Sequence, residues 1–357
     1  MSPLLSYYEA AAHAAALSAV ETVPVLPAPL AAEAFKAMRK IHQCDYVDVE
    51  SQSAMLAYAM ASTIAERRSF TASSNIYALN EAHQASFMRL PLVATNFSRS
   101  LGTFTTRSDL TDLFSLRDAG WLLFIAESPQ ELLDTIIMAY RVCEDNKVLL
   151  PALVNVDGIA NMREVVNVPN RKIIENMLPK LRLPRKLKDN NVFGPPVFDE
   201  YQEFREQQQL AMMNAKKMIK TAGEKWKEKF KRNYGLVEKF YADDADYILV
   251  TAGFYSSSAK SFVLKARQQG EKVGLLRIRV ARPWPSEDVA DAVKNAKKAA
   301  VIDRGVSLGS TGFMHNEVRA SHGFASSFVS YKPLAEKDFA DVLAKLKKQE
   351  KPETVWF

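Results

Sequence analysis

The chain has 357 residues, of which 48% are hydrophobic and 25% are charged, and its formal net charge is +6. This composition is typical of a soluble globular protein of up to two domains. It excludes a membrane protein, because no window approaches the roughly 20 uninterrupted apolar residues that span a bilayer. The two cysteines, Cys44 and Cys143, are too few to hold an iron–sulfur cluster or a four-cysteine zinc site without other chains.

Residues 1–182 are predicted to form a first α/β domain. The Ala-rich start carries Glu9 and His13 and lacks a basic leader. It is therefore interpreted as a helix and not as a signal peptide, which implies a cytoplasmic location.

Helices and strands then alternate along this first domain. The expected helices cover 7–19, 29–41, 52–66 and 76–87, and the expected strands cover 20–26, 45–49, 68–72 and 90–96.

The clearest local pattern lies between residues 117 and 158. Two apolar runs, 121–126 and 148–156, flank an amphipathic helix that begins at Ser128-Pro129 and has Glu131 in its first turn. Ser at the N-cap and Pro at the first helical position form a strong start signal. Apolar strands on both sides of such a helix indicate a parallel sheet with a right-handed crossover.

Residues 183–237 are predicted to be a connector. Its first half is rich in Pro, Asn and Gly and is expected to be irregular, whereas residues 201–233 are expected to form one long helix. Between 205 and 232 there are nine Lys or Arg residues against three Glu. A solvated face, or a face that meets an acidic partner, explains this charge better than a nucleic-acid site, so no nucleic acid is expected as a ligand.

Residues 238–357 are predicted to form a second, smaller α/β domain. A turn at 282–285 and a glycine-containing loop after residue 304 separate its elements. The expected strands cover 247–253, 272–280 and 299–304, and the expected helices include one that ends at 269 and a last one at 336–348.

Five segments of the chain carry a resemblance to a known family. They are RLPLVATNFSRSL (89–101), SDLTDLFSLRDAGW (108–121), VCEDNKVLLPALVNVDG (142–158), VGLLRIRVARPWP (273–285) and AVIDRGVSLGSTG (300–312). In this order they resemble the α subunit of 2-oxoacid:ferredoxin oxidoreductases, of which pyruvate:ferredoxin oxidoreductase is the best-known member. The resemblance spans nearly the whole chain and weakens before residue 45 and across the connector.

The resemblance implies a fold, a cofactor and partners. Residues 1–182 should form a pyrimidine-type thiamine-diphosphate domain with a mostly parallel sheet, and residues 238–357 a domain like the C-terminal domain of transketolase. Thiamine diphosphate should lie between this chain and a β subunit that grips the diphosphate and Mg²⁺. A ferredoxin-like subunit should carry [4Fe-4S] clusters, and a γ subunit should close over coenzyme A. The implied assembly is a dimer of hetero-oligomers that oxidatively decarboxylates a 2-oxoacid.

The family's cofactor-activating residue is altered in this chain. The family places a glutamate in a segment similar to V-E-S-E-H-S-A, and here the segment reads VESQSA (49–54). Counting without gaps to the shared Phe-Thr-Ala at 70–72 puts Gln52 at the activating position, with Ser51 beside it at the cofactor. An amide can hydrogen-bond a ring nitrogen, but it has no carboxyl proton to exchange. Glu50 is expected to be a charge at a helix N-terminus.

The family's substrate-side residues are partly retained. Counting eight residues from Pro91 places the arginine that faces the oxoacid carboxylate at Arg99. The family's Tyr-Pro-Ile-Thr-Pro motif appears as VPVLP (23–27), so Pro24, Val25 and Leu26 should contact the cofactor. Leu26 replaces a substrate-binding threonine. The family's Asp-His-Gln-Asp reads DLTD (109–112), which retains Asp109 as a substrate-side candidate.

Two explanations of these changes compete. The chain either belongs to a working complex with an apolar 2-oxoacid pocket, for example one for an aryl group, or it is a catalytically degenerate α-type subunit with an assembly role. Asp157-Gly158 with Asn190-Asn191 resembles a diphosphate and Mg²⁺ signature, but Val156 replaces its first glycine, so no metal site is expected in this chain. The loop at 305–312 lacks the spacing of a nucleotide-binding loop and is interpreted as structural.

Overall fold

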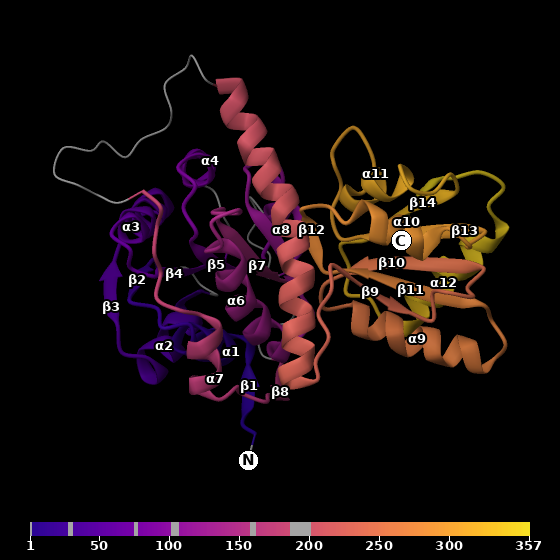
Figure 1. Cartoon of the computed structure of the whole chain (residues 1–357). Coiled ribbons are helices and arrows are strands. Elements are labelled where there is room, and N and C mark those ends of the chain that lie inside the picture. Colours follow the sequence, from indigo (N-terminus) through magenta and orange to yellow (C-terminus); the bar gives the residue numbers. More distant parts are fainter. Residues whose placement is uncertain (1, 28–30, 75–77, 101–106, 158–161, 186–200) are drawn as a thin grey trace.

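The computed structural model describes residues 2–27, 31–74, 78–100, 107–157, 162–185 and 201–357 (Figure 1). Two main β-sheets form its framework. The first has the strand order β12-β6-β7-β5-β4, and the parallel pair β2-β3 continues it through a bridge between Thr22 and Ser69. Its strands are β2 (Thr22–Val25), β3 (Asp45–Asp48), β4 (Phe70–Ser73), β5 (Val93–Phe97), β6 (Leu122–Ala126), β7 (Ala152–Val156) and β12 (Val280–Arg282).

The strands of this first sheet run parallel, apart from β12. The pairing of β6 with β7 confirms the parallel arrangement predicted around residue 130. The helix between them, α6 (Pro129–Cys143), begins where the sequence predicts, since the Ser128 hydroxyl accepts a hydrogen bond from the Glu131 amide. Because parallel strands end at one edge, the residues that follow β2 to β7 gather on the same side of the sheet.

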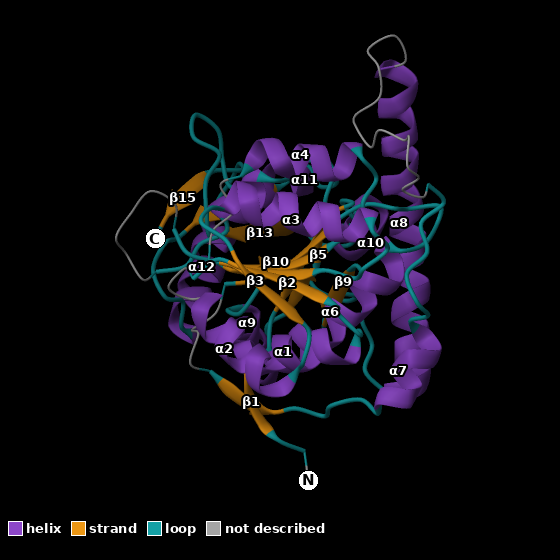
Figure 2. Ribbon diagram, turned by 90° about the vertical axis from the view of Figure 1, so that its left-hand side faces the viewer, coloured by secondary structure: helices purple, strands orange, loops and turns teal. Residues whose placement is uncertain are grey.

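Helices cover both faces of the first sheet. Viewed along the sheet, α3 and α4 lie on one side of the strands and α1 and α2 on the other (Figure 2). A short antiparallel ribbon, β1 (Leu4–Ser6) with β8 (Arg163–Val165), lies outside this layer. The helices of this part are α1 (Tyr7–Leu17), α2 (Ala31–Ile41), α3 (Gln52–Ile64), α4 (Leu79–Phe87), α5 (Thr111–Ser115), α6 and α7 (Arg171–Met177).

The long helix α8 (Tyr201–Phe230) joins the two parts of the molecule. It packs against α6, where Trp226 is fully buried. On its other side Lys216 pairs with Glu287 and Lys220 with Asp288, both on α10 (Ser286–Val293). The first half of the predicted connector falls largely outside the described residues, and the proposed domain boundaries stay predictions. Among the described residues, no helix is both long and apolar enough to cross a membrane, and the cytoplasmic location also stays a prediction.

The second sheet has the strand order β15-β14-β13-β10-β11-β9. Its last helix, α12 (Glu336–Lys348), has the predicted bounds, whereas β14 and β15 have no counterpart among the predicted elements. The strands are β9 (Val237–Phe240), β10 (Tyr247–Ala252), β11 (Val273–Ile278), β13 (Lys298–Asp303), β14 (Ala325–Val329) and β15 (Thr354–Trp356), and the other helices are α9 (Ser256–Gln268), α10 (Ser286–Val293) and α11 (Phe313–Arg319).

The prediction of a single strand over 272–280 is wrong. The chain leaves the second sheet after β11 and enters the first sheet as β12, where Val280 lies opposite Phe124 of β6 in antiparallel register. Both pieces are apolar and extended, so periodicity alone cannot assign them to different sheets. As a result, the C-terminal part supplies the edge strand that covers β6.

Candidate functional site

Several predicted cofactor and substrate residues follow the carboxyl ends of parallel strands in the first sheet. Leu26 follows β2, Ser51 and Gln52 follow β3, and Arg99 follows β5. Since these strands are parallel, the residues lie along one edge of the sheet. In open α/β sheets this edge is the usual place for ligands.

Gln52 is the first residue of α3 and lies half-buried across the end of β4. Its Nε2 donates a hydrogen bond to Ser73 Oγ at 3.2 Å, and Ser73 lies opposite Asn96 of β5 in the sheet register. Ser51 caps the helix, because its hydroxyl accepts from the Ala54 amide at 3.1 Å. Glu50 lies just outside the helix and is exposed. The structure therefore places an amide, and not a carboxyl group, at this point of the edge.

The end of β2 and the residue that follows it are apolar. Pro24 and Val25 are buried and lie opposite Val47 and Asp48 of β3, whereas Leu26 is half-buried. The Pro24 carbonyl accepts a hydrogen bond from the Thr71 hydroxyl at 3.0 Å, which ties β2 to β4. This segment can therefore offer an apolar surface, but no side-chain hydrogen bond, to a ligand at the edge.

Arg99 is half-buried, and its Nε is buried without a hydrogen-bond partner among the described residues. The two neighbours of Arg99 in the chain are serines, and hydrogen bonds to Asp109 and Asp112 hold both of them. Ser98 Oγ lies 2.5 Å from Asp112 Oδ1 and 2.7 Å from the Asp109 carbonyl oxygen, and Ser100 Oγ donates to Asp109 Oδ2 at 2.6 Å. A buried guanidinium nitrogen without a partner costs free energy unless a ligand or a partner chain supplies an acceptor.

Asp109 and Asp112 lie beneath the Arg99 segment, and both are buried. The second carboxylate oxygen of Asp109 accepts from the Thr111 amide at 2.8 Å, so both of its oxygens have donors. Burial raises the pKa of Asp112 to about 6, although hydrogen bonds from Ser98 and Asn96 work in the opposite direction. These contacts favour a supporting role for Asp109 over direct contact with an anionic substrate.

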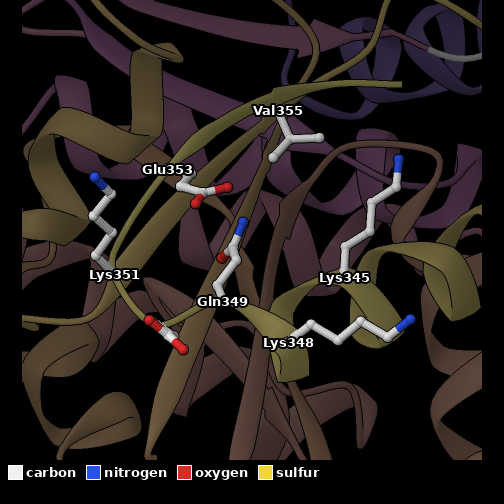
Figure 3. Close-up of a pocket in the computed structure, with 7 residues that line it drawn as sticks. Lys345, Lys348, Gln349, Lys351, Glu353 and Val355 are labelled. Atoms are coloured by element: carbon white, nitrogen blue, oxygen red, sulfur yellow. The ribbon is translucent and has the colours of Figure 1, made fainter.

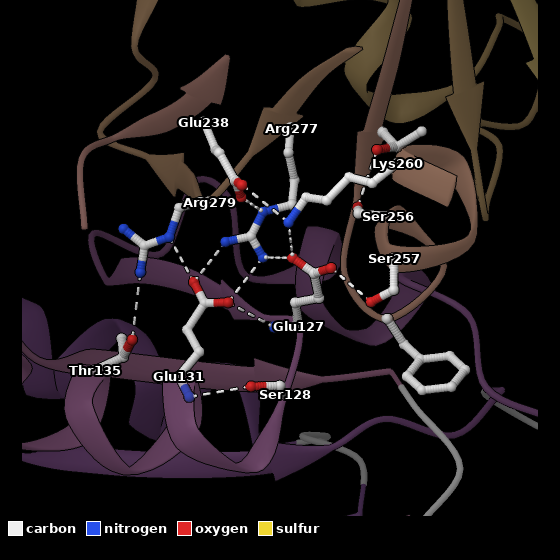
Figure 4. Close-up of polar contacts among 12 residues, drawn as sticks. Glu127, Ser128, Glu131, Thr135, Glu238, Ser256, Ser257, Lys260, Arg277 and Arg279 are labelled. Atoms are coloured by element: carbon white, nitrogen blue, oxygen red, sulfur yellow. Dashed lines mark hydrogen bonds and ion pairs between the residues drawn. The ribbon is translucent and has the colours of Figure 1, made fainter. Parts of the chain in front are cut away.

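The C-terminal part of the chain covers the other half of this edge (Figure 4). Glu127, which follows β6, accepts from Ser257 at 2.6 Å and pairs with Lys260 at 2.8 Å. Asp157, which follows β7, accepts from the Phe254 amide at 2.8 Å. Among the described residues, the C-terminal part therefore covers the ends of β6 and β7, whereas the candidate residues follow β2, β3 and β5.

The carboxylate of Asp157 is packed against the backbone at Gly253. A Cβ on Gly253 would lie 2.1 Å from Asp157 Oδ1, so the backbone at Gly253 contacts the carboxylate directly. Its suggested companions, Asn190 and Asn191, lie outside the described residues. Within the described ranges, no three His, Cys, Asp or Glu side chains are grouped so that they could hold a metal ion.

A surface hollow of about 820 Å³ lies far from this edge, beside the end of α12 (Figure 3). Its lysines do not converge, since Lys351 points away from Lys345 and Lys348. Gln349 at its base is buried and accepts a hydrogen bond from Ser326 at 2.7 Å. Because Glu350 and Glu353 also line it, the hollow has mixed charge and does not match the predicted site.

Some residues of the site carry little sequence signal of their own. Ser98 and Ser100 contact Asp112 and Asp109, but the sequence hints at this only through the Ser-Arg-Ser order after an apolar strand and the DLTD segment (109–112). The pairing of Glu127 and Glu131 with Arg277 joins positions more than 140 residues apart. Such contacts follow from the tertiary fold and cannot be inferred from local spacing.

Comparisons with known proteins match both parts of the chain. The family model described as "Pyruvate flavodoxin/ferredoxin oxidoreductase, thiamine diP-bdg" matches residues 10–224. "Pyruvate:ferredoxin oxidoreductase core domain II" matches residues 245–333. The chain is 32% identical to pyruvate synthase subunit PorA of Methanothermobacter thermautotrophicus, over 89% of this chain and 86% of that protein. It is also 32% identical to ketoisovalerate oxidoreductase subunit VorA of Pyrococcus abyssi, over 77% and 72%.

Solved structures agree on the fold. A 2-oxoglutarate:ferredoxin oxidoreductase from Magnetococcus marinus superposes with a TM-score of 0.72 at 14% identity, over 97% of this chain and 65% of that longer chain. A split-gene transketolase gives a TM-score of 0.55 at 10% identity, over 96% and 97%. These likenesses confirm the predicted fold class. Together with the matches over most of its length, they establish that this chain belongs to the 2-oxoacid:ferredoxin oxidoreductases as an α-type subunit of a thiamine-diphosphate-dependent enzyme complex.

Proposed function

We propose that this chain forms one side of a thiamine-diphosphate site in which a 2-oxoacid is oxidatively decarboxylated. The observation that carries the proposal is the position of Leu26, Gln52 and Arg99. They follow parallel strands at one edge of the sheet, away from the ends of β6 and β7, which the C-terminal part covers. A second subunit has to complete this site, so the isolated chain should not catalyse oxidation of the 2-oxoacid.

The residues present fit the aminopyrimidine end of thiamine diphosphate in part. The Gln52 amide can donate a hydrogen bond to a ring nitrogen, Ser51 holds the start of α3, and the segment of Pro24, Val25 and Leu26 offers apolar contact. The chemistry that thiamine diphosphate supplies when bound is an electron sink for loss of carbon dioxide from the 2-oxoacid. Gln52 orients the ring but has no carboxyl proton to exchange with it.

Arg99 receives the carboxylate of the 2-oxoacid in this proposal. Its guanidinium has five donors in a planar fork that suits a carboxylate, and its buried Nε has no acceptor among the described residues. Leu26, in place of a hydroxyl side chain, favours an apolar 2-oxoacid. Two relatives are named for pyruvate and ketoisovalerate, whose side chains are also apolar.

The remaining parts of the reaction fall to partner chains. A β subunit would grip the diphosphate and Mg²⁺, a ferredoxin-like subunit would carry [4Fe-4S] clusters, and a γ subunit would close over coenzyme A, in a dimer of hetero-oligomers. Two points support this division. The chain has only two cysteines, and Cys143 is buried. The relatives are themselves named as subunits.

The alternative is a catalytically degenerate α-type subunit with a role in assembly. The observation in its favour is the amide of Gln52 where the family has a carboxyl group. Such a subunit would keep the fold and its contacts with partner chains, but substitution of Arg99 would not change 2-oxoacid-dependent turnover.

Arg99→Ala in the purified complex separates the two functions. Loss of a charge-assisted contact should raise the KM for the 2-oxoacid, or lower kcat/KM, by about 10- to 100-fold. The measurement is 2-oxoacid-dependent reduction of a ferredoxin-type acceptor. Arg117→Ala is the matched control and should leave the rate unchanged, because among the described residues Arg117 pairs only with its exposed neighbour Asp118. Unchanged kinetics in Arg99→Ala would contradict the catalytic proposal.

A further inference from the structure

The segment that carries Arg99 is tied down on both sides of the arginine. On one side, the Ser98 amide donates to the Val156 carbonyl at 2.8 Å, and its hydroxyl lies within hydrogen-bond distance of Asp112. On the other side, the Ser100 amide donates to the Arg107 carbonyl at 3.1 Å, and its hydroxyl donates to Asp109. Within the described part of the chain, the Nε of Arg99 has no hydrogen-bond partner. The supporting bonds therefore hold the backbone and leave the guanidinium available.

Asp112 links this segment to the sheet below it. Its side chain is 1% exposed, and its Oδ2 accepts from Asn96 Nδ2 of β5 at 2.6 Å. Asn96 Nδ2 also donates to Asn155 Oδ1 of β7 at 2.7 Å. The Leu113 amide donates to Asp112 Oδ1 at 2.8 Å, at the oxygen that Ser98 also reaches. One buried carboxylate thus connects two strands, the helix α5 and the Arg99 segment.

The C-terminal part of the chain holds the same support from the other side. The Arg304 guanidinium donates to the Ser108 carbonyl, and the Leu110 amide donates to the Arg304 carbonyl at 2.8 Å. Ser108 Oγ donates to the Asp157 carbonyl at 2.5 Å. Residues 108–112 are therefore fixed to both sheets. A support that is fixed in this way can keep Arg99 in one position while the substrate binds and leaves.

We propose that Asp109 and Asp112 are positioning residues that act through Ser100 and Ser98 to hold Arg99 at the 2-oxoacid carboxylate. This inference rests on the proposed function of Arg99. Neither carboxylate contacts the substrate in this arrangement, because each of their oxygens already accepts a hydrogen bond from the chain. A small displacement of a substrate-binding group can cost up to about 100-fold in rate, so an indirect support has a measurable effect.

Ser98→Ala tests the support with little change in volume. In the complete complex it should raise the KM for the 2-oxoacid by about 10-fold, the effect of losing a hydrogen bond to a charged group, with kcat changed less than about twofold. Ser115→Ala is the matched control, because in the part of the chain that the structure describes the Ser115 hydroxyl bonds only the Thr111 carbonyl of the same helix. It should leave both constants unchanged. Ser100→Ala provides a second, independent variant on the Asp109 side.

The Arg99→Ala background makes the test specific. If the serines act through Arg99, Ser98→Ala should have no further effect on KM once Arg99 is absent, a non-additivity that a general loss of stability would not produce. Equal effects of Ser98→Ala in both backgrounds would overturn the positioning role and leave the proposed function intact. An ineffective Arg99→Ala would instead overturn the proposed function itself.

Asp112 is tested by comparing two substitutions. Asp112→Asn keeps an oxygen for Ser98 and the Leu113 amide, and rotation of the Asn96 and Asn155 amides together can satisfy the new NH₂ group. It should therefore restore most of the affinity for the 2-oxoacid that Asp112→Ala loses. Equal KM values in the two variants, with both complexes intact by size-exclusion chromatography, would contradict a role through hydrogen bonding.

Discussion

At the scale of single residues, the proposed site keeps the arginine that the family has there but lacks the family's glutamate. Arg99 keeps the cation expected at a carboxylate, whereas Gln52 replaces the carboxyl group expected at the cofactor ring. The structure gives Gln52 a defined environment, because its amide donates to Ser73 at the end of β4. An amide in that position can bind and orient a ring nitrogen, but it cannot take part in acid–base exchange.

Gln52→Glu should therefore change the pH dependence of the reaction in an active complex. A carboxyl group at this position should add a titrating limb to the pH–rate profile of kcat and raise kcat by at least about 10-fold, since acid–base assistance is worth about 10²–10⁴-fold. Gln84→Glu, on the exposed face of α4, serves as the control with the same change in charge. An identical pH–rate profile in wild type and Gln52→Glu would favour the assembly role.

At the scale of elements, α6 shows what local sequence can and cannot predict. Ser128 and Pro129 correctly predict where the helix begins, because capping depends on neighbouring residues. The same first turn also carries Glu131, which lies 2.7 Å from Arg277 and 2.5 Å from Arg279 (Figure 4). No local pattern indicates that Arg277 and Arg279 are its partners, because they lie far away in the sequence. The change of sheet between β11 and β12 also depends on distant contacts, so local sequence does not predict it.

Glu131 should contribute to stability in a pH-dependent way. Burial alone would raise the pKa of Glu131, but Arg277 and Arg279 outweigh it, so the pKa lies below the usual value. A lowered folded-state pKa means that the stabilisation is present above about pH 4.5, the unfolded value, and is lost as the pH falls through the folded pKa.

Glu131→Gln should lower the free energy of unfolding by about 3–5 kcal/mol at pH 7, because it leaves two buried arginines without this partner. Urea unfolding of variant and wild type at pH 7 and below pH 4 measures the effect, and the difference should shrink in acid. Glu175→Gln, which breaks an exposed pair with Arg171 at 3.9 Å, should cost under about 0.5 kcal/mol. A pH-independent difference would contradict the charge-based explanation.

At the scale of the whole molecule, the C-terminal part completes the first sheet. It supplies the edge strand β12, and it covers the ends of β6 and β7 through Glu127 and Asp157. The candidate residues follow the other strands of the sheet, β2, β3 and β5. The resemblance predicted the fold and the family correctly, and the structure adds the support beneath Arg99. That support depends on contacts among β5, β7, α5 and β13, which no single segment encodes.

Binding of thiamine diphosphate by isothermal titration calorimetry tests most directly whether this chain supplies one side of a shared site. The isolated chain should show no saturable binding at cofactor concentrations that saturate the complex with its β subunit, and only the complex should reduce an acceptor with a 2-oxoacid. The β subunit alone serves as the control. Stoichiometric binding and 2-oxoacid oxidation by the isolated chain would contradict this account.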